Sequence, residues 1–174
     1  MPPRQVLVFG LGSPHGDDQA GWLVARQIAE QVVDEGLTNR VQVYELRSPW
    51  DLLDHLCPDA PIVIVDAFAT PRSTAPSSDT PPTELPPAES SPAEVMLIEE
   101  SALATSPLAA RSSHGGSLPE LLQLARSLAG QLGPITIIGI PARNCAPGSE
   151  VSNDMPDRIA YAKSLVWQQI LRDG

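Results

Sequence analysis

Three acidic residues and one histidine stand where their side chains could do chemistry. Asp17 and Asp18 are adjacent in the turn GLGSPHGDDQAGW, Asp66 follows the apolar run PIVIV, and His114 lies in RSSHGGSL. A carboxylate at the end of an apolar strand needs solvent, a hydrogen-bond donor or a cation. Two carboxylate oxygens and an imidazole nitrogen suit a divalent transition metal. The spacing forms no local metal motif, so the set depends on a fold that gathers these residues.

Each candidate also has a purely structural interpretation. Asp17 suits the N-cap of a helix starting near Asp18, and this is the interpretation we favour for it. His114 precedes an amphipathic helix, and a contact with that helix end explains it about as well as a functional role. His15 neighbours the aspartate turn and could approach the same site, whereas His55, among leucines, is predicted to be a packing or surface residue.

The glycine-rich turn fits neither a nucleotide site nor a serine hydrolase. A dinucleotide fingerprint needs a third glycine at position 15, where this chain has His15, and Gly16 comes one residue late. Carboxylates at a helix start would also repel phosphate. A Walker A loop and a GxSxG elbow are both missing from the sequence.

Short apolar strands alternate with amphipathic helices, and these elements must position the candidates. Several strands are apolar throughout, which favours a parallel sheet covered on both faces. We therefore predict an α/β fold with three layers, α/β/α, around a mostly parallel twisted sheet of about five strands, phosphorylase/hydrolase-like. Strands are expected at residues 5–9, 41–46, 61–65, 95–99 (an edge strand) and 135–140. Helices are expected at residues 18–33, 50–57, 117–132 and 156–171.

Length and composition predict a single domain spanning residues 1–174. Residues 71–94 hold 7 prolines and 8 serines or threonines, and this Pro/Ser-rich insertion is expected to be mobile and without chemistry. The net charge of −10 argues against nucleic acid or an anionic membrane as partner. Without a signal or membrane-spanning segment, the expected location is cytoplasmic. Cys57 and Cys145 are expected to be reduced structural thiols.

Four segments resemble, in order, the motifs of the hydrogenase maturation endopeptidases, which process the large subunit of [NiFe]-hydrogenases. They are VLVFGLGSPHGDDQAGW, IVIVDAFA, SSHGGSLPELLQLA and ITIIGIP. The resemblance implies that Asp18, Asp66 and His114 match the family's metal-binding or metal-sensing positions. It also implies that the nickel is supplied by the substrate rather than being a resident cofactor.

The sequence therefore predicts an endopeptidase that removes the C-terminal extension of a nickel-loaded hydrogenase large-subunit precursor, and that acts as a monomer. One alternative is a non-proteolytic protein that binds nickel or the precursor on the same scaffold. Another is a hydrolase resembling peptidyl-transfer-RNA hydrolase, against which the acidic charge counts. Whether hydrolysis is metal-catalysed, and whether His15, Asp17 or Glu45 takes part, stays open.

Overall fold

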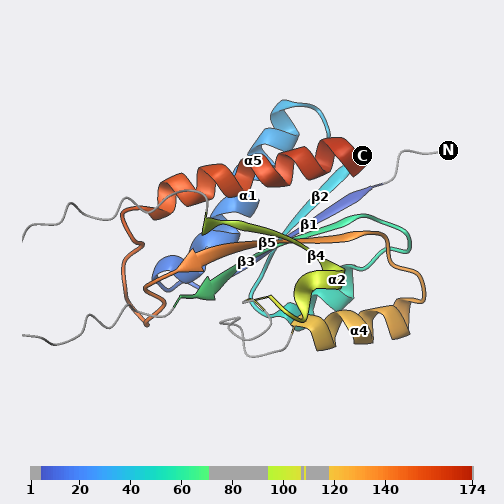
Figure 1. The fold of residues 1–174 in the computed structure, drawn as a ribbon. Coiled ribbons are helices and arrows are strands. Elements are labelled where there is room, and N and C mark those ends of the chain that lie inside the picture. Colours follow the sequence, from blue (N-terminus) through green and yellow to red (C-terminus); the bar gives the residue numbers. More distant parts are fainter. Residues whose placement is uncertain (1–4, 71–93, 107, 109–117, 174) are drawn as a thin grey trace, which may run out of the picture.

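A five-stranded sheet forms the middle layer of the structure (Figure 1). The computed structural model describes residues 5–70, 94–106, 108 and 118–173. The strand order is β2-β1-β3-β5-β4, in which the first four strands are parallel and β4 runs antiparallel to β5. The strands are β1 Val6–Leu11, β2 Val41–Leu46, β3 Ile62–Ala69, β4 Met96–Glu99 and β5 Ile135–Ala142. The predicted mostly parallel sheet of about five strands is confirmed, and the predicted edge strand, β4, lies at one edge and is antiparallel.

Helices cover both faces of the sheet, as expected for apolar parallel strands (Figure 1). One face carries α1 (Ala20–Asp34) and α5 (Met155–Asp173). The other carries α4 (Leu118–Ala129), the short α2 (Glu100–Leu103) and the 3₁₀ helix η2 (Pro49–His55). This is the predicted three-layer arrangement. None of the helices in the described ranges is both long and apolar enough to cross a membrane.

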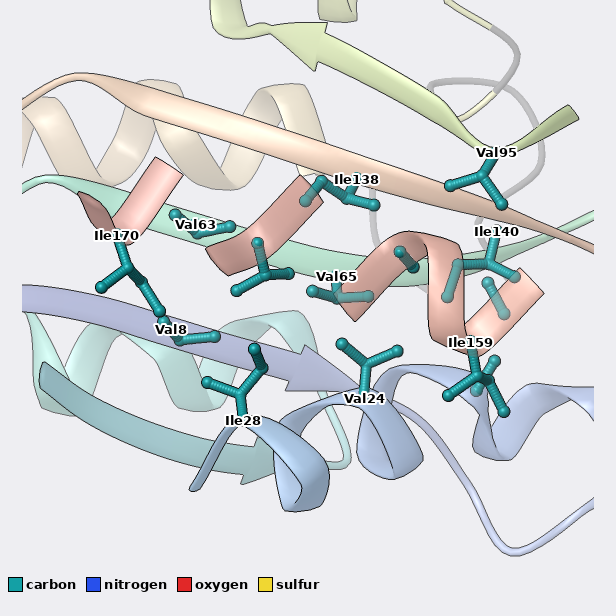
Figure 2. Packing of buried hydrophobic residues seen from close by; sticks show 14 of the residues in the cluster. Val8, Val24, Ile28, Val63, Val65, Val95, Ile138, Ile140, Ile159 and Ile170 are labelled. Atoms are coloured by element: carbon teal, nitrogen blue, oxygen red, sulfur yellow. The ribbon is translucent and has the colours of Figure 1, made fainter. Parts of the chain in front are cut away.

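The alternation of side chains along β3 divides the apolar interior into two cores. Val63 and Val65 join the core beneath α1 and α5, whereas Ile62 and Ile64 join the core above α4. Figure 2 shows the first core, where valines and isoleucines of the strands meet those of the two helices. Full burial of each such side chain contributes roughly 1.5–3 kcal/mol. Asp66, by contrast, is an acidic residue in a strand whose other residues are all apolar.

Glycines let the start of α1 lie directly against the sheet. A Cβ atom on Gly21 would collide with the carbonyl oxygen of Leu11, and one on Gly10 would collide with the carbonyl oxygen of Gly21. The glycines of this turn therefore serve close backbone packing. This gives a physical reason for a glycine-rich turn that does not match a phosphate-binding fingerprint.

Several element ends differ from the sequence expectation. The first helix is preceded by a separate 3₁₀ turn, η1 (Gly16–Gln19), so α1 begins at Ala20 rather than near Asp18. Helix α4 ends at Ala129 because Gly130 adopts a left-handed φ of 74° and donates its N–H to the carbonyl of Arg126. Leu128, in the last turn of α4, is 68% exposed.

Candidate functional site

The strand order reverses between β1 and β3, and the candidate carboxylates lie at this point. The chain passes from β1 through α1 to β2 on one side of β1, whereas β3 leads to strands on the other side. Open α/β sheets bind ligands beyond the carboxyl ends of their strands at such a switch point. Asp18 follows β1, and Asp66 comes directly after Val65, the last β3 residue paired with β1. The topology therefore brings both predicted residues to one edge of the sheet.

Asp66 lies inside β3, not at its end as the sequence analysis predicted. The strand continues to Ala69 because β5 extends equally far and pairs with it up to Ala142. Asp66 is fully buried and sits opposite Gly139 in this ladder. Burial of a carboxylate is costly, and such groups concentrate at functional sites. The burial makes Asp66 the most unusual acidic residue of the sheet.

Asp18 is held in η1 by the folded turn that precedes it. The Ser13 N–H donates to the Asp18 carbonyl oxygen over 3.2 Å, and the Asp18 N–H donates to the His15 carbonyl oxygen over 3.0 Å. The residue is only 5% exposed. Because η1 leads straight into α1, the positive end of the helix dipole favours a negative charge there. The turn thus fixes a carboxylate beside the switch point.

Asp17 has a structural role, but not the N-cap that we predicted. Its carboxylate accepts four hydrogen bonds from the loop that joins β5 to α5. The donors are Arg143 N at 2.8 Å, Asn144 N at 3.1 Å, Ser152 N at 2.7 Å and Ser152 Oγ at 2.7 Å. The cap positions before η1 and α1 are His15 and Gln19, and neither side chain makes a capping bond.

Gly16 completes this attachment between the two turns. Its φ is +48°, a left-handed conformation that favours glycine, and a Cβ atom there would collide with the carbonyl oxygen of Asn144. The Gly16 N–H donates to the Ser149 carbonyl over 3.0 Å, and the Asp17 N–H donates to the Asn144 carbonyl over 2.9 Å. The η1 turn and the loop after β5 therefore form one hydrogen-bonded unit.

Cys145, in this loop, was not predicted to belong to the site. Burial, together with the negative charges of Asp18, Asp17 and Asp66, raises the pKa of its thiol from 9.0 to about 11. All three carboxylates therefore lie within electrostatic reach of one half-buried sulfur atom. A lone cysteine far along the chain from these aspartates carries no sequence motif, so only the fold reveals this proximity.

Cys145 is expected to react unusually slowly with iodoacetamide in the folded protein. In a Cys57→Ser variant, which keeps only this thiol, alkylation at pH 9 should be about 50-fold slower in the native state than in urea, because the thiolate fraction falls from half to about one per cent. The raised pKa also means that the unfolded chain loses this proton first, so stability should fall as pH rises from 9 towards 11. Equal native and denatured rates would contradict the electrostatic proximity.

The other candidates of the sequence analysis have separate positions. Glu45, at the end of β2, forms an exposed ion pair with Arg26, with a shortest N–O distance of 2.7 Å. His55 stacks on Tyr44 with ring centroids 4.1 Å apart, which confirms it as a packing residue. His15 is half-buried at the start of η1. His114 lies outside the described residues.

A metal-binding set is incomplete within the described part of the chain. There, no three His, Cys, Asp or Glu side chains are grouped closely enough to hold a metal ion. Asp18 and Asp66 supply carboxylate oxygens, so a metal bound between them needs further donors. His114, or a group of the substrate, is a candidate for the missing donor.

Comparison with known proteins identifies the fold. No protein-family model matches the chain, and neither does any curated protein sequence. Solved structures do match over nearly the whole chain. The [NiFe] hydrogenase maturation protease HybD from Thermococcus kodakarensis is 23% identical, with a TM-score of 0.69, covering 95% of this chain and 99% of that one. This chain has the hydrogenase maturation protease fold.

Two structures from Escherichia coli show the same likeness. The hydrogenase maturating endopeptidase HybD is 16% identical with a TM-score of 0.65, and a second endopeptidase is 19% identical with a TM-score of 0.69. Each comparison covers 98% of this chain and 94% of the other. The overall fold is therefore shared over nearly the whole chain, although few residues are identical.

Proposed function

We propose that this chain is an endopeptidase that removes the C-terminal extension of a nickel-loaded [NiFe]-hydrogenase large-subunit precursor. The proposal rests above all on the pair Asp18 and Asp66, two buried carboxylates at the switch point of the sheet. The fold shared with proteins named as hydrogenase maturation proteases supports it. The four sequence motifs that resemble this family carry both aspartates.

In this proposal, Asp18, Asp66 and His114 bind nickel that arrives with the substrate. Carboxylate and imidazole donors suit a divalent transition metal, and nickel already held by the precursor supplies the remaining ligands. The metal would then bring the C-terminal extension to the carboxyl edge of the sheet. A Lewis acid there polarises a carbonyl group or activates water. An empty precursor would lack the bridging cation, so processing would follow nickel insertion.

The position of Leu108 supports the assignment of His114 to this site. Leu108 is fully buried, and its side chain occupies the space that Gly139 leaves open. Gly139 is the partner of Asp66 in the β3–β5 ladder. Leu108, six positions before His114 in the sequence, therefore packs against the ladder partner of Asp66, on the face of the sheet that α4 covers.

Purified protein should cut nickel-loaded precursor and leave nickel-free precursor intact. A gel assay of the two forms, with mass spectrometry of the released extension, tests this expectation. Cleavage of both forms equally would overturn the role of nickel. Binding of the nickel-loaded form without cleavage would instead support the alternative of a non-proteolytic nickel- or precursor-binding protein.

A further inference from the structure

The loop between β5 and α5 lines an open surface hollow of about 480 Å³. It lies beside η1, because Asp17 and Gly16 are bonded to the same loop. In Figure 1, this loop is at the side to which the arrowheads of β3 and β5 point. Its polar lining residues are Arg143, Asn144, Glu150, Ser152, Asn153 and Asp154. We call this hollow the loop groove.

Two buried charged side chains, Asp17 and Arg158, hold the loop groove in shape. Asp17, which is fully buried, accepts the hydrogen bonds from the N–H groups of the loop. Arg158, on α5 and 1% exposed, donates to the Pro141 carbonyl over 2.6 Å and pairs with Asp154 and Glu94 at 3.0 Å each. Burying charge is costly, so this loop is far more constrained than an ordinary surface connection.

The lining of the loop groove indicates the chemistry of its ligand. The side-chain amides of Asn144 and Asn153 have both donor and acceptor groups, as the N–H and C=O groups of a peptide require, whereas the Ser152 hydroxyl donates to Asp17 and offers an acceptor only. Arg143 pairs with Asp154 at 3.4 Å, so with Glu150 the groove keeps a net negative charge, which disfavours phosphates and other anions. The volume lies within the roughly 300–1,000 Å³ typical of ligand sites.

We infer that the loop groove binds an extended, polar segment of the protein substrate next to its scissile bond. The inference rests on the proposed function, because the groove has meaning as a substrate site only if a peptide bond is cut near Asp18 and Asp66. Asp17 is hydrogen-bonded to Arg143, Asn144 and Ser152 of the groove and directly precedes Asp18 in η1, so a chain in the groove lies next to the turn that carries Asp18. Asp17 and Arg158 are then positioning residues, which act through the loop.

Filling the groove tests this inference. Asn153 is an exposed lining residue, so Asn153→Trp should preserve the fold while occupying the groove. With nickel-loaded precursor, the KM should rise by at least about fivefold and kcat should stay within about twofold. The matched control is Asn39→Trp, an exposed turn residue at the opposite edge of the sheet, which should change neither constant. Equal melting temperatures of both variants verify folding.

A second pair guards against a folding defect in the first. Glu150→Trp also fills the groove, and Glu35→Trp, at the far end of α1, is its control. If wild-type protein cuts the precursor and both groove variants retain its KM, or lose kcat alone, the groove is not the peptide site. If the wild type itself leaves nickel-loaded precursor uncut, the proposed function fails. The two failures are therefore distinguishable.

Discussion

Asp66→Asn and Asp18→Asn variants are expected to leave nickel-loaded precursor uncut, with kcat/KM lowered by about 10³-fold or more. Each substitution keeps the size of the side chain, removes its charge and replaces one acceptor oxygen with an NH2 donor. The neutral amide is a poor ligand for a divalent cation and cannot act as a base. The same loss is expected for His114→Ala. A time course of precursor cleavage, followed on gels over a thousandfold range of enzyme concentration, measures the effect.

These variants should fold as well as the wild type. Asp66 is fully buried, and replacing a buried carboxylate by an amide of equal size removes a desolvated charge. Catalytic charges commonly reduce stability, so the melting temperature of Asp66→Asn should equal or exceed that of the wild type. The pKa of Cys145 should also move back towards its ordinary value, since a negative neighbour is lost. This shift in thiol reactivity reports that the site has kept its geometry.

Glu45→Gln is the matched control for these carboxylates. Glu45 also lies at the carboxyl end of a strand, but it is exposed and pairs with Arg26. Loss of a surface ion pair changes stability by about 1 kcal/mol or less. Processing should therefore stay within about twofold of wild type. Normal cleavage by Asp66→Asn or Asp18→Asn would refute the assigned site. A large loss of precursor processing in Glu45→Gln would indicate that the site also includes the end of β2.

The sheet could be predicted because its strands are short apolar runs, whereas the end of β3 could not. In IVIVDAFA, one aspartate interrupts a run that remains apolar on both sides. The charge predicts that the strand ends there, but pairing with β5 extends the strand to Ala69. The strand ITIIGIPA is equally long, and only its position beside β3 shows that Asp66 is enclosed. A single acidic residue inside an apolar run is the sequence signal of this buried carboxylate.

The roles of the adjacent aspartates depend on contacts that sequence spacing does not reveal. Asp17 binds donors that lie 126 to 135 positions further along the chain. Local pattern therefore favoured a helix cap, the common role of aspartate at such a place. Arg158 was missed for a similar reason, because a helix that needs an apolar face gives no sign of a buried arginine. In both cases the partner is a loop whose path is set by the whole fold.

Asp17→Ala is expected to lower the free energy of unfolding by about 3 kcal/mol, since hydrogen bonds to a charged acceptor contribute about 1.5–3 kcal/mol and their donors are left unpaired. For a chain of this length, that corresponds to a melting temperature lower by roughly 6–12 °C. Ser152→Ala removes one of the four bonds and should cost about 1–2 kcal/mol. Urea unfolding, followed by circular dichroism, measures each change.

The contrast between Asp17 and its neighbour is the decisive part of this prediction. Asp18→Asn should unfold at nearly the same urea concentration as the wild type, yet fail to process the precursor. Asp17→Ala should unfold at a lower urea concentration but, when folded at low temperature, still cut the precursor. Because Asp17 fixes the loop groove, its remaining activity should show a raised KM with little change in kcat. An Asp17→Ala protein of wild-type stability would contradict the hydrogen bonds that link η1 to the loop after β5. A loss of kcat with unchanged KM would instead indicate that Asp17 takes part in the reaction itself.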